Sequence, residues 1–486
     1  MKVEETESTT GSPGLVRALG PGMATALVVG NVIGAGIFLK PGQAVSEAGT
    51  VPVALAAWAA GGVLCLLGAL TIAELGLRLP KAGGLYVYLR EGFGGPIAFL
   101  FGWTEFVFGM PASIGALAAG STLQIGAVAG RPFAVWEGAT VASLLIIGLA
   151  AINVAGVLWG GRTQFATTAV KCLFLAGLAA LPFVITLAGG TAIDTSHYTQ
   201  SVGSTGGDSS LPARFSGALL AVLWTYNGWH VIAPVAEEVS EPQRNIPIAL
   251  IVGSSILITL YLAAVLAYHG ALSTDTVIDA SREGILPQTM TDTLLAPLGG
   301  GVVATAALLI SLAVFCSMAG SLNASLISGP RVGFAMARDR VFPAVLAEVH
   351  PRFRTPAAAI VTQASMSITL VLASAALVAS FDHFRERSVF DLLSDYVTFT
   401  ANVFLMFAVA AIFPIRRRGG PLPGYVTPLY PWIPLAYIAA SLAFLVYIFI
   451  GKPAEAGVGI LLSLAGLPVY WWMKRRRSPQ SHLGSA

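Results

Sequence analysis

Residues 30–38 read GNVIGAGIF, and this stretch sets three glycines and an alanine inside an apolar run from Ala24 to Leu39. Glycine in a helix interior costs about 1 kcal/mol relative to alanine. Inside a bilayer, a backbone group that such a residue frees finds no water to bind. A break of this kind persists in a membrane helix only where something else uses the freed groups, so we predict a functional break at 34–36.

The composition is that of a polytopic membrane protein. Of 486 residues, 55% are hydrophobic and 10% are charged, and the mean hydropathy is +0.77, whereas soluble proteins carry about 25% charged residues. Residues 1–18 hold acids and hydroxyls but lack the apolar region of a signal peptide, so we expect a solvated tail. Cys65, Cys172 and Cys316 lie in apolar runs and are predicted to pack rather than to form disulfides.

Twelve windows of about 20 apolar residues are long enough to cross the hydrocarbon core of a bilayer. They lie near 19–41, 50–77, 93–123, 136–155, 163–188, 213–236, 246–270, 300–328, 356–380, 389–414, 429–450 and 455–473. We predict that the first ten form two halves of five, 19–188 and 213–414, and that 429–473 adds two more.

The basic residues sort by membrane side. Of the 27 Lys and Arg residues, 19 fall in the N-terminal tail, alternate loops and the C-terminal tail 474–486. Seven fall in the opposite loops, and Lys171 alone lies within a span. By the positive-inside rule we predict that both termini are cytoplasmic and that the chain lies in a cell membrane. The net charge of +3 therefore does not indicate nucleic-acid binding.

A second break occurs in the sixth window, LLAVLWTYNGWHVIAPVAEE at 219–238, where 225–228 read TYNG. The first and sixth windows occupy corresponding positions in the two halves, and paired broken helices mark the binding site of an inverted-repeat transporter. Half-helix N-termini offer amides and positive dipole ends to an anionic group, while free carbonyls accept from a cationic group. A zwitterionic substrate suits both. The alternative is that the small residues only let two helices pack closely.

The sequence contains four motifs that resemble those of the L-type amino acid transporters, a family of the amino acid–polyamine–organocation superfamily. Among these transporters it is most similar in type to the microbial members. The four motifs are GNVIGAGIF at 30–38, AELGLRLPKAGGLYVYLREGFGG at 73–95, GWHVIAPVAEEVSEPQRNIP at 228–247 and SMAGSLNASLISGPRVGFAMARDRVFP at 317–343. The resemblance covers nearly the whole chain. It implies an all-α fold of twelve membrane helices of the leucine-transporter type, with five-plus-five inverted repeats, broken helices one and six, and a substrate site halfway across.

The resemblance also implies which residues bind an amino acid. The expected substrate site consists of Val32, Ile33, Gly34, Ala35, Gly36, Trp224, Thr225, Asn227 and His230. In it the amides at 34–36 take the α-carboxylate, carbonyls at 32–33 and 224–225 take the α-ammonium, and Trp224 covers the substrate as an aromatic gate. Ala35 stands where many members have serine, which removes a hydroxyl but keeps the amide.

Lys171, in the fifth window, is a charged residue deep in the membrane and therefore a functional-site candidate. In relatives that use sodium, an ion sits between spans one and eight. The resemblance implies that the Lys171 ammonium replaces this ion and bonds to carbonyls of the broken first span, so that transport does not need sodium. The alternative is a lysine that snorkels to the interface. Ser321 and Asn323 on the eighth window are expected near Lys171.

Other polar residues lie within the windows. Glu105 matches an acidic position of the family and is expected to bond within the helix bundle. His230 stands where several relatives have asparagine, and either contacts the substrate side chain or lies on a proton path. No acidic residue is evident around Trp224, Asn227 and His230, which favours neutral over cationic amino acids.

Charges at the end of the sixth window suggest an inner gate. Glu237 and Glu238 begin its cytoplasmic exit. With Arg244, and with Arg338 or Arg340 as partners, they are predicted to close the cytoplasmic side, unless they are ordinary solvated charges.

The sequence therefore predicts a sodium-independent amino acid transporter, in the first place an exchanger of neutral L-amino acids that works by alternating access. A proton-coupled symporter and a non-transporting amino acid sensor on the same fold are the alternatives. No phosphate loop, metal-ligand cluster or nucleophile elbow indicates an enzyme, and no metal or cofactor is expected. Animal members are disulfide-linked to a heavy chain through a cysteine between spans three and four. The loop 124–136 has none, so no such partner is expected.

Overall fold

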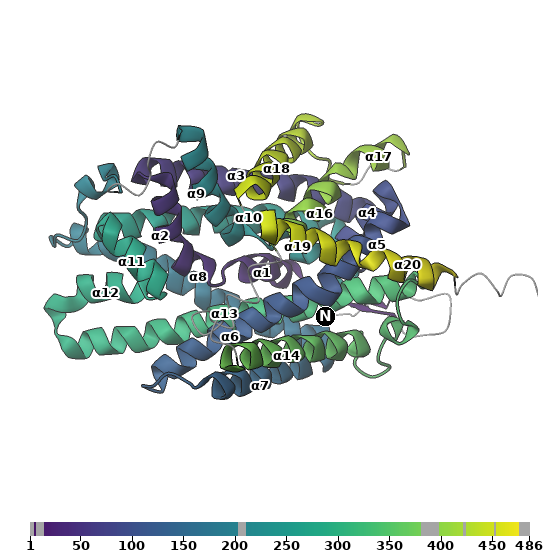
Figure 1. Ribbon diagram of the computed structural model, residues 1–486, viewed down its shortest axis with the longest axis horizontal. Coiled ribbons are helices and arrows are strands. Elements are labelled where there is room, and N and C mark those ends of the chain that lie inside the picture. Colours follow the sequence, from purple (N-terminus) through teal and green to yellow (C-terminus); the bar gives the residue numbers. More distant parts are fainter. Residues whose placement is uncertain are drawn as a thin grey trace, which may run out of the picture.

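The computed structural model describes residues 4–5, 14–202, 210–380, 398–420, 424–451 and 453–475. These residues are almost entirely helical (Figure 1). Strand is confined to a two-residue antiparallel pairing of β1 (Glu4–Glu5) with β2 (Val16–Arg17). Among the described residues, ten helices are long and apolar enough to cross a bilayer, and a bent pair counts as an eleventh. The all-α membrane fold is thus confirmed, while the count of twelve stays a prediction.

The first half of the chain starts with the bent pair. α1 (Pro21–Val32) and α2 (Gly36–Ala48) meet at 45° across 33–35, as the glycine cluster predicts. The elements that follow are α3 (Val51–Arg78), α4 (Leu85–Phe93), α5 (Gly95–Trp103), the π-helical turn η1 (Thr104–Gly109), α6 (Met110–Val128), α7 (Val135–Val154), α8 (Val157–Leu187) and η2 (Thr195–Thr199). α5, η1 and α6 run on as one span of 34 residues.

The second half also starts with a broken span. α9 (Leu211–Tyr226) has 16 residues and is followed across 227–228 by the 3₁₀ helix η3 (Trp229–Glu238). The elements after it are α10 (Pro242–Ala271), α11 (Thr274–Glu283), α12 (Leu286–Leu295), η4 (Ala296–Leu298), α13 (Gly300–Arg338), η5 (Ala344–Ala347), α14 (Ala357–Ser380), α16 (Thr398–Ala410) and α17 (Ile412–Arg417). The chain ends with α18 (Trp432–Gly451), α19 (Pro453–Leu464) and α20 (Gly466–Arg475).

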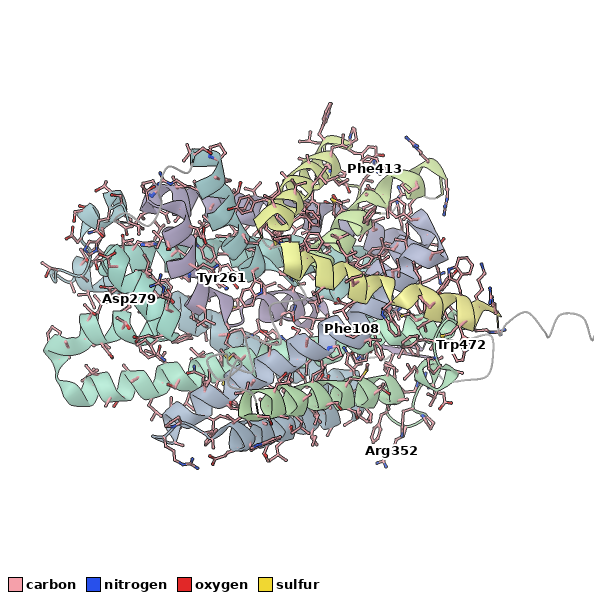
Figure 2. The ribbon with its side chains drawn as sticks, viewed as in Figure 1. Phe108, Tyr261, Asp279, Arg352, Phe413 and Trp472 are labelled. Carbon is pink, nitrogen blue, oxygen red and sulfur yellow. The ribbon has the colours of Figure 1, made fainter. Side chains whose placement is uncertain are left out.

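The broken first span lies at the centre of the bundle. α1 packs against α8, α10 and α13, and α2 packs against α9 and α11; Figure 1 shows α1 enclosed by these helices. Tyr261 on α10 lies in the interior beside α1, whereas Asp279 and Trp472 lie at opposite ends of the long axis (Figure 2). The centre of the molecule is therefore where the backbone departs from regular helix.

The described end of the N-terminal tail is not solvated, which corrects the expectation for its last residues. Leu15 is fully buried, and the amides of Ala18 and Leu19 both donate to the carbonyl of Glu238 at 3.0 Å. The apolar residues from Leu15 onward thus already join the packed bundle. Residues 1–3 and 6–13, residues 389–397 of the tenth predicted window, and all of 476–486 lie outside the described residues.

Candidate functional site

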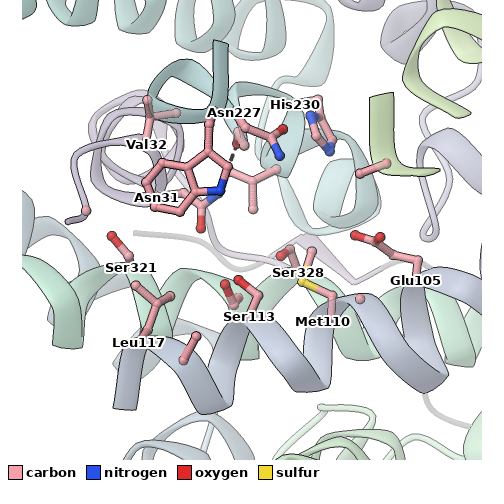
Figure 3. Close-up of a pocket in the computed structure, with 18 of the residues that line it drawn as sticks. Asn31, Val32, Glu105, Met110, Ser113, Leu117, Asn227, His230, Ser321 and Ser328 are labelled. Carbon is pink, nitrogen blue, oxygen red and sulfur yellow. Dashed lines mark hydrogen bonds between the residues drawn. The ribbon is translucent and has the colours of Figure 1, made fainter. Parts of the chain in front are cut away.

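A cavity of about 190 Å³ lies between the two helix breaks (Figure 3). The expected site residues that line it are Val32, Gly34, Ala35, Gly36, Trp224, Thr225, Asn227 and His230. Ile33 does not line it. Residues from η1, α6 and α13 complete the wall, and those that sequence reasoning missed include Asn31, Glu105, Met110, Ser113, Leu117 and Ser328. The cavity is of the size of a small ligand and mixes polar with apolar groups.

The first break presents backbone amides to this cavity. The amide of Gly34 is occupied, because it donates to the carbonyl of Val32 at 2.7 Å. The amide of Ala35 has no acceptor among the described residues. Gly36 is the first residue of α2, so its amide has no acceptor within that helix. The N-terminus of a 13-residue helix, with its positive dipole end, therefore faces the cavity at Ala35 and Gly36.

Lys171 holds the first break from the other side. Its side chain is fully buried, and Nζ donates to the carbonyls of Gly30 at 2.6 Å, Ile33 at 2.8 Å and Ser317 at 2.8 Å. An ammonium has three N–H donors, and all three are matched. This burial excludes the snorkelling alternative for Lys171. It also explains why Ile33 is missing from the cavity wall, since its carbonyl is turned toward the ammonium.

Two serines on α13 complete this cluster. Ser317 Oγ donates to the Ile33 carbonyl at 2.8 Å, and Ser321 Oγ lies 3.0 Å from the Gly30 carbonyl. The expected neighbour Asn323 lies two residues after Ser321 on α13 and its Nδ2 donates to Gln164 Oε1 at 2.9 Å. Carbonyls that α1 can no longer satisfy thus receive donors from α8 and α13, as a break inside a membrane requires.

At two positions of the first break, neighbouring helices pack so close to the backbone that only glycine fits. A Cβ on Gly30 would lie 2.0 Å from Thr168 Oγ1 on α8, and one on Gly36 would lie 2.7 Å from Thr225 Cγ2 on α9. The first approach lets Lys171 reach the Gly30 carbonyl, and the second brings the two breaks into contact.

Two side chains that the sequence analysis missed tie the breaks together. Asn31 Nδ2 donates to the Gly228 carbonyl at 3.1 Å. The Tyr261 hydroxyl lies 2.8 Å from the Val32 carbonyl and 3.5 Å from that of Thr225. The first tie therefore joins the end of α1 to Gly228 in the second break, and the second joins it to the end of α9. The position of Asn31 inside the glycine cluster was a signal in the sequence, while nothing local distinguishes Tyr261.

The second break turns at Gly228. Its φ is +98°, in the left-handed region, and a Cβ there would lie 2.2 Å from Asn31 Nδ2. Only glycine meets both conditions without strain. One turn earlier, the Trp224 ring lies under Lys40 Nζ, 5.0 Å from its centroid, and lines the cavity between α9 and α2.

Glu105 is placed differently from the expectation. Its carboxylate lines the cavity, and no described residue donates a hydrogen bond to it or forms an ion pair with it. The prediction that Glu105 bonds within the bundle is therefore wrong. The expectation that no acidic residue lies near the site is also wrong, because Glu105 lines the cavity. The residue lies in η1, where a π-helical turn adds one residue per turn and alters which side chains face inward.

Beyond the second break, acidic residues of η3 are bound by arginines of α13. Glu238 and Arg331 are both buried and form a bidentate pair, with distances of 2.7 and 2.9 Å. Glu237 pairs with Arg338 at 2.8 Å and accepts from the Ala82 amide at 3.0 Å. The predicted pairing of Glu237 with Arg338 is thus present in the structure. Arg244 instead lies 3.9 Å from the exposed Glu241.

This arrangement can bind a small zwitterion. Unpaired amides of a helix N-terminus, carbonyls at the end of α9 and an aromatic ring surround the cavity. Among the described residues, no cluster of three or more His, Cys, Asp or Glu side chains could hold a metal ion.

Comparison with known proteins relates this chain to membrane transporters of amino acids. Residues 19–473 match the family model described as "Amino acid permease". The chain is similar to the serine/threonine exchanger SteT of Bacillus subtilis (strain 168), with 33% identity over 470 residues that cover 96% of this chain and 98% of the relative. It is similar to the large neutral amino acids transporter small subunit 2 of Rattus norvegicus, at 29% identity over 96% of this chain and 83% of that one. It is also similar to the human cystine/glutamate transporter, at 26% identity over 93% and 85%.

Proposed function

Because this chain belongs to the amino acid permease family, we propose that it is a sodium-independent exchanger of neutral L-amino acids that works by alternating access. The family and the long apolar helices make it a membrane-embedded, multi-pass transporter rather than an enzyme. Relatives named as exchangers of serine and threonine and as a transporter of large neutral amino acids support a neutral substrate.

One observation carries the sodium-independent part of the proposal. Lys171 Nζ bonds to carbonyls of Gly30, Ile33 and Ser317, which come from spans one and eight. Backbone carbonyls and serine oxygens are also what a sodium ion would need there. The fixed ammonium interacts with the same carbonyl dipoles and orders the same backbone. Binding of a sodium ion is therefore not required to stabilise the break.

The cavity supports a specific pose for an amino acid. Its α-carboxylate binds the amides of Ala35 and Gly36, at the positive end of α2. Its α-ammonium binds the carbonyls at the end of α9. Among the described residues, the Thr225 carbonyl has only the Tyr261 hydroxyl, 3.5 Å away, as a donor. The carbonyls of Val32 and Ile33 are occupied by donors already. Trp224, Asn227 and His230 then surround the substrate side chain.

Alternating access needs elements that part on one side of the site. The inverted repeats 19–188 and 213–414 supply them in our proposal, with α1 and η3 as moving half-helices. The Glu238–Arg331 and Glu237–Arg338 pairs join η3 to α13 and form the inner gate. Both termini then lie in the cytoplasm, the tails being 1–18 and 474–486, and the protein lies in the cell membrane. It functions without a disulfide-linked heavy chain, because the loop 124–136 has no cysteine.

Proton-coupled symport is the second candidate, and one observation favours it. Glu105 and His230 are two titratable side chains in the wall of the same cavity. Either could carry a proton that moves with the substrate.

Purified protein in liposomes separates the candidates. Uptake of radiolabelled amino acids is measured for a panel of neutral, cationic and acidic substrates, with and without internal amino acid and with and without a pH gradient. An exchanger takes up label only into vesicles that hold internal substrate. Uptake into empty vesicles that follows the proton gradient would replace the proposal with symport, and saturable binding without any uptake would indicate a sensor.

A further inference from the structure

One end of the cavity carries polar groups that have no hydrogen-bond partner among the described residues. The Glu105 carboxylate has no donor among the described residues. His230 Nδ1 and Ser328 Oγ also line this cavity and are buried without a hydrogen-bond partner in the described structure. A buried polar group without a partner costs free energy. Two such groups beside the unpaired, partly buried Glu105 carboxylate in one cavity wall indicate that their partner is a ligand.

These groups lie away from the backbone amides. Figure 3 shows the Glu105 carboxylate pointing into the cavity on the same side as the His230 imidazole, with Ser321 and Leu117 at the opposite end and Ser328 between. Asn31 and Val32, at the first break, lie toward the Ser321 end. A substrate whose α-carboxylate rests on the first break therefore extends its side chain toward Glu105.

We propose that Glu105, His230 and Ser328 form a polar side-chain subsite that selects amino acids whose side chain ends in a hydrogen-bond donor. An ionised carboxylate can accept hydrogen bonds but cannot donate them, so it matches the O–H of a hydroxyl or the N–H of an ammonium. The serine hydroxyl and the imidazole then bond to the other atoms of that group. An aliphatic side chain of equal size would leave all three groups desolvated and unpaired, and the site would reject it.

This inference rests on the proposed function and specifies which end group the site prefers on the substrate side chain, a hydroxyl in a neutral amino acid before an ammonium. Threonine and valine are nearly isosteric and differ only in that threonine has a hydroxyl where valine has a methyl group. Serine differs from alanine only by the presence of a hydroxyl. The cost of leaving one buried polar group unpaired corresponds to about a tenfold or greater difference in apparent affinity. A cavity without this subsite would treat the two members of each pair alike or favour the more apolar one.

The test uses the full chain in liposomes loaded with amino acid, and labelled threonine and valine as probes. The parent is expected to prefer threonine by about tenfold or more. Glu105→Met keeps the length of the side chain and removes the acceptor, so threonine uptake should fall at least tenfold relative to valine uptake. Ser328→Ala should lower the same ratio. Glu283→Gln, at an exposed acid at the end of α11, is the matched control and should leave the ratio unchanged.

Two further measurements keep the outcome interpretable. If Glu105→Met does not fold, Glu105→Gln is compared instead, with thermal stabilisation of the purified protein by threonine and by valine. Preference for 2,3-diaminopropionate over serine would identify the donor as an ammonium. A parent that exchanges amino acids but takes valine as well as threonine, or a Glu105→Met variant that keeps the preference, would overturn the subsite. Failure to exchange any amino acid would overturn the proposed function itself.

Discussion

Replacing Lys171 by alanine removes the ammonium that holds the first break in place. The carbonyls of Gly30 and Ile33 keep donors in the hydroxyls of Ser321 at 3.0 Å and Ser317 at 2.8 Å, so neither is left without a partner. We therefore expect the variant to fold. What it loses is a charged group with three short hydrogen bonds, each worth about 1.5–3 kcal/mol in a protein.

The expected consequence is weaker substrate binding. The amide of Ala35 lies only two residues after Ile33, so ordering of the break and ordering of the anion site are coupled. Coupling between two sites is typically about 1–3 kcal/mol, or roughly 5–150-fold in affinity. Substrate at a hundred times its dissociation constant stabilises the parent by about 2.7 kcal/mol, and a hundredfold loss of affinity reduces this to about 0.4 kcal/mol.

Substrate-dependent thermal unfolding of the purified protein measures this loss without relying on transport. Lys81→Ala is the matched control, because Lys81 is an exposed lysine on the loop between α3 and α4. It should leave the substrate-induced shift unchanged. A Lys171→Ala protein that folds, binds and exchanges like the parent would show that the lysine merely packs.

Three more variants test other contacts. Trp224→Ala should weaken apparent affinity and slow exchange together, because it opens the cavity beside α2; unchanged uptake kinetics in a folded variant would remove Trp224 from the site. Gly228→Ala places a Cβ 2.2 Å from Asn31 Nδ2 at a φ of +98°, so exchange should be abolished, whereas Gly457→Ala, with nothing within 4 Å, should be neutral. Arg331→Met leaves Glu238 buried and unpaired, which should destabilise the fold by about 3–5 kcal/mol. Adding Glu238→Leu should restore most of that stability, and a melting temperature equal to the parent's in the single variant would show that the pair is unimportant.

Local sequence was sufficient for the features that depend on the chain's own periodicity. The apolar windows predicted the long helices, and the glycines at 34–36 predicted the bend between α1 and α2. Lys171 stood out because a charge deep in an apolar run is costly. Its acceptors could be assigned to the first span only through the family resemblance, since no pattern in the sequence gives a distance between spans.

Features that depend on how helices are rotated against one another could not be predicted in this way. Glu105 was expected to bond within the bundle, but the π-helical turn sets it in the cavity wall. Ile33 was expected at the substrate, but the buried ammonium turns its carbonyl away. Arg331, within the long α13, has no local mark of its pairing with Glu238, because the two residues are 93 positions apart. Such pairings follow from tertiary packing alone.

The central claim is that the ammonium of Lys171 replaces a bound sodium ion at the first break. Exchange of labelled threonine in liposomes, measured in sodium-free choline buffer and in sodium buffer on both sides, tests it most directly. Equal initial rates and equal apparent affinities in the two buffers are predicted for the parent. Exchange that requires sodium, or that tightens its apparent affinity tenfold when sodium is added, would contradict the assignment of Lys171.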